Sequence, residues 1–170
     1  MTVGGMRRVA ALLLPVALAG CGLHPLYEGG THGAVAQKLA QVEIEPIGGQ
    51  SGWLMRNALA DRIGASGHDT PRYKLIVELD DQIVGLGIRS DNTVTRERRT
   101  LRARFRLITA DAAGTTLLDA SAGSDAGIDV VSSDYATVAA EQTALENLTS
   151  DVADQIVARI AVFAHRTQGR

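Results

Sequence analysis

Alternating arginines in the segment 93–109 are the residues best suited to chemistry. Five of them share one parity: Arg96, Arg98, Arg102, Arg104 and Arg106. Four apolar residues share the other parity: Leu101, Ala103, Phe105 and Leu107. Because alternate side chains of a strand share a face, the pattern predicts a strand with one buried face and one arginine face. Guanidinium groups bind phosphates and carboxylates through paired hydrogen bonds, so this face is a candidate surface for an anion or a partner.

Acidic residues on the neighbouring segments offer a second interpretation of the arginine face. Glu78 and Asp80 precede it and Asp119 and Asp125 follow it, each on the parity opposite to apolar residues. Cross-strand ion pairs of this kind contribute only about 0.2–1 kcal/mol each. The pattern favours a paired, solvated face for most of the arginines and leaves one or two of them for an anion.

The single cysteine, Cys21, follows a segment with the layout of a secretory signal peptide. Arg7 and Arg8 precede an apolar run, Val9 to Ala19, and no acidic residue occurs before Glu28. This run is shorter than the roughly 20 residues that span a bilayer. The run ends in Leu-Ala-Gly-Cys at 18–21, which resembles the lipobox of bacterial lipoproteins. The alternative is a free or buried cysteine behind an ordinary signal peptide.

The lipobox resemblance implies a diacylglycerol on the thiol of Cys21 and, after cleavage, an N-acyl chain on its amino group. Stable attachment to a membrane takes at least two chains or signals, so the mature protein is expected to be anchored without spanning. Gly22 follows the cysteine, where Asp is typical of inner-membrane retention, so the resemblance implies the periplasmic side of the outer membrane. We expect a signal peptide at 1–20, a lipid-anchored tether at 21–37 and a single domain at 38–166.

Motifs for catalysis, metals and nucleic acid are missing from the sequence. No Gly-Lys-Ser or Gly-Lys-Thr occurs, and the four histidines lack metal-ligand spacing. Ser51 is interpreted as a helix cap, since Trp53 stands where a nucleophile elbow has glycine. The net charge is −2, and removing residues 1–20 makes it −4; aromatic residues are 4%. We therefore expect no catalytic residue, no metal, no cofactor beyond the acyl groups on Cys21, and no nucleic-acid partner.

The elements that must position these residues follow in the order β-α-β-β-β-α. Alternation predicts an edge strand over 42–47, closed by Pro46, and strands over 73–85, 93–109 and 115–126. Helical periodicity predicts a helix from Gly52 to about 65 and a long one over 133–164, capped by Ser132 or Ser133. Glycines at 85 and 87 predict a bend or bulge. The fold class is α+β: a two-layer sandwich with a mostly antiparallel sheet of about four strands, covered on one face by two helices.

Taken in order, these pieces resemble the LPS-assembly lipoprotein family (LptE, also called RlpB). The resemblance rests on the segments 21–27 (CGLHPLY), 51–54 (SGWL), 56–59 (RNAL), 96–101 (RERRTL) and 135–136 (YA), the strand from Tyr73 and the long helix. It implies a non-catalytic plug, one to one, inside the large β-barrel LptD, which delivers lipopolysaccharide to the outer leaflet. It also implies lipopolysaccharide binding. The alternative is an outer-membrane lipoprotein that binds or shuttles lipid for a transport system without a permanent barrel.

Overall fold

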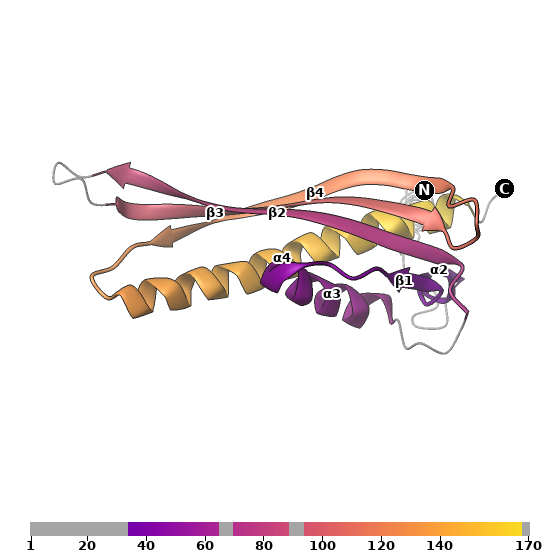
Figure 1. Ribbon diagram of the computed structural model, residues 1–170, viewed down its shortest axis with the longest axis horizontal. Helices are drawn as coiled ribbons and strands as arrows, with labels where there is room; N and C mark the ends of the chain where they lie inside the picture. The colour runs from indigo at the N-terminus through magenta and orange to yellow at the C-terminus, as the bar shows by residue number, and fades with distance from the viewer. Residues whose placement is uncertain (1–33, 65–69, 89–93, 168–170) are drawn as a thin grey trace, which may run out of the picture.

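A four-stranded sheet forms one layer of the computed structural model, which describes residues 34–64, 70–88 and 94–167 (Figure 1). The strand order is β1-β2-β3-β4. The strands are β1 (Val42–Ile44), β2 (Tyr73–Ile88), β3 (Val94–Thr109) and β4 (Thr116–Asp129). β1 pairs with β2 in parallel, and the other two pairings are antiparallel. Cys21 and the predicted signal peptide lie outside the described residues.

Three helices form the second layer and lie on one face of the sheet (Figure 1). They are α2 (Ala34–Leu39), α3 (Gly49–Ile63) and α4 (Asp134–Arg166). With 33 residues, α4 is about 50 Å long, while the 15 residues of α3 give about 22 Å. α3 therefore lies beside only part of α4: it reaches Gln142 and Ser150, and no helix of the described residues lies beside the first turns of α4 (Figure 1).

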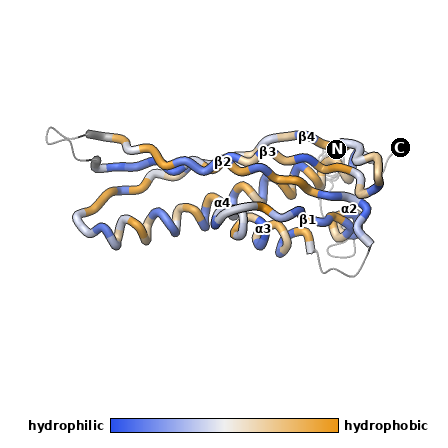
Figure 2. Tube along the Cα trace, viewed as in Figure 1, coloured by the Kyte–Doolittle hydropathy of each residue, from blue (hydrophilic) through white to orange (hydrophobic). Residues whose placement is uncertain are grey.

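The hydrophobic core fills the space between β3 and α4. Leu101 and Phe105 of β3 are fully buried, as are Val152 and Ile156 of α4. Each belongs to a periodic apolar series, of period two on the strand and of three to four residues on the helix (Figure 2). Both layers are thus amphipathic, and burial of these two faces stabilises the sandwich.

The predicted fold class is confirmed, and so is the start of the long helix. Ser133 is the N-cap of α4, and its side chain accepts a hydrogen bond from the backbone N–H of Ala136. Gly64, in the left-handed conformation at φ 66°, ends α3 by donating its N–H to the carbonyl of Ala60. These termini follow the expected capping rules because the capping residues are local in sequence.

Three local predictions were wrong. Ser51 is not a cap: α3 begins at Gly49 with Gly48 at the N-cap and no side-chain cap. The bend at 85–87 is absent, since β2 continues to Ile88 with Gly85 paired to Glu97. The first strand ends at Ile44 instead of residue 47, although it does lie at the sheet edge.

Helix α2 was not predicted, and its first four residues fall in the range assigned to the tether. Val35 and Leu39 of α2 are buried against the core. Lys38, between them, donates from Nζ to the carbonyl oxygen of Ala164 at 3.3 Å, close to the C-terminus of α4. A cation there is favourable because the last helical carbonyls carry partial negative charge.

The start of α3 is fixed by an unusually close backbone contact. A Cβ on Gly52 would lie 2.5 Å from the carbonyl oxygen of Ile47 and 2.9 Å from its Cγ2. Only glycine allows the first turn of the helix to approach residue 47 so closely. The other end of α3 is held by Arg62, whose Nε donates to Asp154 Oδ1 at 2.6 Å and whose Nη2 donates to Ser150 Oγ at 2.7 Å.

Candidate functional site

The sheet face opposite the helices carries the five predicted arginines of β3, and we call it the arginine face. On the reverse side of the strand, Leu101, Ala103, Phe105 and Leu107 are at most 2% exposed, which matches the predicted alternation. No helix or strand of the described residues covers the arginine face. β4 supplies small residues beneath the long side chains, because Gly123 lies under Arg102 and Gly127 under Arg96. A charged, open surface therefore runs along the length of β3.

Four of the five arginines have acidic partners on neighbouring strands. The tightest pair is Arg104–Asp119, with Nη2–Oδ2 at 2.9 Å and Nε–Oδ1 at 3.3 Å. The other three pairs have closest N–O distances of 3.3, 3.9 and 3.4 Å and are Arg106–Glu78, Arg98–Asp125 and Arg96–Asp129. Asp129 was not counted as a partner in the sequence analysis, because β4 was expected to end near residue 126. The paired interpretation thus describes four of the five positions.

The Arg104–Asp119 pair sets the strongest local electrostatics of the arginine face. The hydrogen bond from Arg104 holds the pKa of the Asp119 carboxyl below its ordinary value. The same hydrogen bond raises the pKa of the Arg104 guanidinium. Both side chains stay ionised at neutral pH, and both are exposed, so their mutual attraction is screened by solvent. The pair orients the Arg104 fork more than it stabilises the fold.

Arg102 differs from its neighbours, because it makes no ion pair with any residue the structure describes. Its cross-strand neighbours are Asp80 on β2 and Gly123 on β4. The carboxylate of Asp80 accepts instead from Gln82 Nε2, at 3.0 and 3.2 Å. Arg102 lies across Gly123, where a Cβ would come within 3.2 Å of its Nη1. Its donors are therefore available to an incoming anion.

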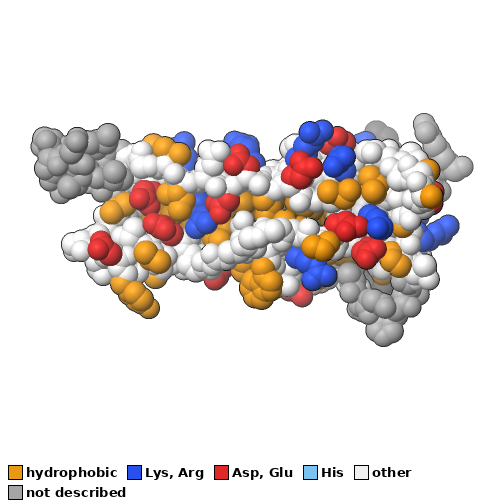
Figure 3. Space-filling model, viewed as in Figure 1, with side chains coloured by type: hydrophobic (Ala, Val, Ile, Leu, Met, Phe, Trp, Pro, Cys, Tyr) orange, Lys and Arg blue, Asp and Glu red, His pale blue; other side chains and the backbone are white. Residues whose placement is uncertain are grey.

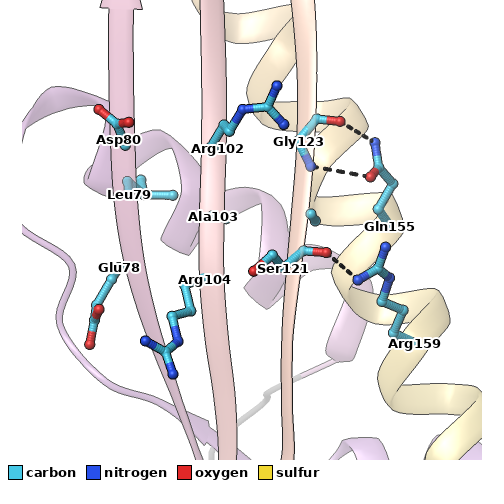
Figure 4. A pocket seen from close by; sticks show the side chains of 11 residues that line it. Glu78, Leu79, Asp80, Arg102, Ala103, Arg104, Ser121, Gly123, Gln155 and Arg159 are labelled. Carbon is cyan, nitrogen blue, oxygen red and sulfur yellow. Dashed lines mark hydrogen bonds between the residues drawn. The ribbon is translucent and has the colours of Figure 1, made fainter.

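Arg102 lines an open depression of about 570 Å³ that crosses the sheet from β2 to α4 (Figure 4). Its charged residues are Glu78, Asp80, Arg102, Arg104 and Arg159. The lining residues alone carry three cations against two carboxylates, and Asp119 compensates Arg104 from beside the depression. The guanidinium of Arg102 is therefore the group in the depression that could bind a phosphate or carboxylate, because Arg104 donates to Asp119 and Arg159 to the carbonyl of Ser121 (Figure 4).

Two side chains of α4 reach around β4 at the border of this depression. Gln155 Nε2 donates to the carbonyl of Gly123 at 3.2 Å, and its Oε1 accepts from the N–H of Gly123 at 3.3 Å. Arg159 donates to the carbonyl of Ser121 (Figure 4). These groups lie on the outer edge of the sheet, so α4 satisfies backbone positions that a fifth strand would otherwise use.

One ion pair on the helix-facing side was missed by the sequence analysis. Arg99 of β3 binds Asp81 of β2 through two bonds, at 2.8 and 2.6 Å, and its Nη1 donates to the carbonyl of Glu141 at 2.9 Å. The Arg99 and Asp81 side chains are only 13% and 19% exposed. Both residues occupy positions of the apolar, helix-facing parity of their strands. Two opposite charges at such positions on neighbouring strands are the sequence signal that could have predicted this ion pair.

Residues 34–64, 70–88 and 94–167 contain no group of three or more His, Cys, Asp or Glu side chains that could hold a metal ion. None of the helices in these ranges is long and apolar enough to cross a membrane.

A two-layer domain with one uncovered, charged sheet face is a module suited to binding another molecule. Comparison with protein families identifies the family to which this module belongs. The chain belongs to the LptE family, described as lipopolysaccharide-assembly, which matches residues 39–160. The family comprises non-catalytic lipoproteins of lipopolysaccharide assembly, which agrees with the expectation drawn from the sequence. No curated protein matches the chain.

Solved structures share the fold at low sequence identity. A protein from Caulobacter crescentus CB15 is 24% identical, with a TM-score of 0.67 over 79% of this chain and 98% of its own. The rare lipoprotein B of Shewanella oneidensis is 10% identical, with a TM-score of 0.57 over 75% and 96%. A minor lipoprotein of Acinetobacter baumannii is 17% identical, with a TM-score of 0.54 over 71% and 88%. The two-layer architecture is thus retained while most side chains change.

Proposed function

We propose that this protein is an outer-membrane lipoprotein, acylated at Cys21, that serves as plug and assembly partner of an LptD-type β-barrel, one to one. In this role it takes part in inserting lipopolysaccharide into the outer leaflet. Membership of the LptE family supports the pathway. The lipobox at 18–21 supports the anchor, which holds the domain at the periplasmic side of the outer membrane.

The observation that carries the proposal is the arginine face. The lumen of a large outer-membrane barrel is polar, so a plug needs a rigid surface with charged groups directed outward. β3 provides this surface over 16 residues, backed by a fully buried inner side. The paired arginines give a fixed pattern of charge, and Arg102 adds free donors for a phosphate such as those of lipid A.

The test is affinity purification of the tagged, full-length lipoprotein from outer membranes, followed by mass spectrometry. We expect a stoichiometric barrel of the LptD type. Recovery of the acylated lipoprotein alone, or with inner-membrane transport components, contradicts the plug and favours a lipid shuttle. A Cys21→Ala variant is expected to be lost from the outer-membrane fraction, and normal fractionation of this variant contradicts the anchor.

The arginine face is tested by charge reversal with a matched control. Arg102→Glu combined with Arg104→Glu is expected to weaken binding of purified lipopolysaccharide, or of the barrel, at low salt. Arg166→Glu, an exposed change near the end of α4, is the control and is expected to leave both unchanged. Unchanged binding by the double variant would show that the arginine face is only a solvated surface.

A further inference from the structure

The first turns of α4 carry exposed apolar side chains that no other helix or strand of the described residues covers. Tyr135 is 86% exposed and Val138 is 60% exposed. On β2, Ile83 is 41% exposed and lies on the sheet face directed toward α4, since it pairs with Arg99. We name these three residues the distal ledge. It lies on the helix side of the sheet, opposite the arginine face.

At the distal ledge, the helix layer consists of α4 alone among the described residues, without α3 beside it. Tyr135, Val138 and Gln142 follow at steps of three and four and share one face of α4. α3 meets this face at Gln142, whose Oε1 accepts from Gln50 Nε2 at 2.8 Å. Toward the core end, Arg62 of α3 reaches Ser150 and Asp154 of α4. The face that α3 covers from Gln142 onward is therefore left open at Val138 and Tyr135 (Figure 1).

The Asp81–Arg99 pair joins the apolar side chains of the ledge across the two layers. Arg99 bonds the carbonyl of Glu141, one helical turn after Val138. Ile83 lies directly across from Arg99 on β2. The Asp81–Arg99 pair thus lies between Ile83 on the sheet and Val138 on the helix. A bidentate, largely buried pair holds this geometry rigidly, which lowers the entropic cost of docking.

Charge around the distal ledge is negative. Four carboxylates lie on or beside it and only one guanidinium: Asp81, Glu97, Asp134 and Glu141 against Arg99. Glu97 Oε2 is buried and has no hydrogen-bond donor among the described residues. Hydrophobic and acidic side chains interleave over this end of the molecule (Figure 3). An occupant must therefore be apolar on the contacting side and basic at its border.

We propose that the distal ledge docks a segment of a partner protein that presents apolar side chains flanked by Lys or Arg. Such a segment would continue the layer that α3 leaves open and would pair the excess carboxylates. An anionic lipid surface is disfavoured by the same carboxylates. The described chain begins at α2, at the opposite end of the molecule, which disfavours its own N-terminal segment as the occupant (Figure 1). The inference needs a protein partner but not the barrel named above.

The test is photo-crosslinking of the full-length lipoprotein in the cells that make it. Benzoylphenylalanine is placed at position 138 and, as the control, at position 162, where Val162 is 37% exposed on the same helix. We expect an adduct from position 138 with another polypeptide, at least tenfold stronger than from 162. The cross-linked peptide should contain Lys or Arg beside apolar residues. An adduct with a second copy of this chain, with lipid alone, or no adduct overturns the proposal.

A matched pair of variants separates docking from folding. Val138→Asp should reduce the adduct formed from position 135 at least tenfold, while Val162→Asp should leave it unchanged. Both positions are exposed, so both variants are expected to keep the wild-type thermal midpoint. An unchanged adduct in the Val138→Asp variant overturns the proposal. If the barrel fails to co-purify but the adduct from position 138 persists, the proposed function is wrong and the docking site stands. If the barrel co-purifies but no adduct forms from position 138, only the docking site is wrong.

Discussion

The close contact at the start of α3 makes a specific and unusual prediction for Gly52→Ala. Replacing glycine by alanine inside a helix normally stabilises it by about 1 kcal/mol. Here the new Cβ would lie 2.5 Å from the carbonyl oxygen and 2.7 Å from the carbonyl carbon of Ile47. Both atoms are backbone, so relief requires the first turn of α3 to move. Overpacking of this kind costs about 3 kcal/mol at its upper range, so we expect a net loss of about 2 kcal/mol.

The measurement is thermal and urea unfolding of the purified lipoprotein in detergent, followed by circular dichroism at 222 nm. A loss of about 2 kcal/mol lowers Tm by about 8 °C in a domain of this size. Gly48→Ser is the control, because a Cβ at Gly48 meets nothing within 4 Å. A serine at this N-cap is expected to change stability by only a few tenths of a kcal/mol. If Gly52→Ala is as stable as the wild type, or more stable, the tight α3–Ile47 packing is refuted.

Three further predictions concern stability. Arg99→Gln leaves the carboxylate of Asp81, 19% exposed, without its guanidinium and should cost about 2 kcal/mol; a double-mutant cycle with Asp81→Asn that shows no coupling would contradict the pair. Ser51→Ala should change urea stability by less than about 0.5 kcal/mol, since Ser51 is not the cap, and a loss near 1 kcal/mol would restore that role. The hydrogen bond from Arg62 lowers the pKa of Asp154. The Arg62–Asp154 interaction therefore stabilises the folded state above a pH of about 4. This stabilisation is lost as the pH falls through the lower, folded pKa of Asp154. The Arg62→Met variant should lose less of its free energy of unfolding than the wild type as the pH falls from about 5 to about 3. If the two proteins depend on pH identically, this linkage is excluded.

Sequence periodicity predicted the parts of the fold whose signals are local. From Leu101 to Leu107, β3 alternates between apolar residues and arginines, so both its conformation and its two faces could be predicted. α4 combines a long apolar stripe with a serine cap at Ser133, and both signals lie within the helix itself. In each of these elements the signal lies in the element's own residues, although the backbone hydrogen bonds of β3 are made with β2 and β4.

Elements that depend on tertiary contacts could not be predicted. α2 is six residues long and has no acidic residue in its first turn, so its helical form depends on packing of Val35 and Leu39. The strand β1 itself was predicted from alternation over 42–47, but its end at Ile44 and its parallel pairing with residues 73–75 depend on the sheet and are revealed by no local pattern.

The candidate site divides in the same way. Alternation placed all five arginines on one face, but the partner of each depends on strand register. Register made Asp129 the partner of Arg96, although it lay beyond the predicted end of the strand. Register also left Arg102 opposite a glycine on β4 and a carboxylate already bound by Gln82. Arg102 therefore could be recognised as the unpaired arginine only from the folded sheet.

The side chains that reach around β4 have a consequence for the protein before it meets any partner. A lipoprotein confined to a membrane surface is locally concentrated, and exposed strand edges in such a crowd are templates for cross-β aggregation. Gln155 occupies both backbone groups of Gly123, and Arg159 occupies the carbonyl of Ser121. A strand from a neighbouring copy cannot form a continuous ladder along this edge without first displacing them. The side-chain amide of Gln155 makes the two hydrogen bonds that a backbone peptide would make with Gly123. Because it is not part of a strand, it offers no edge for a further strand to pair with.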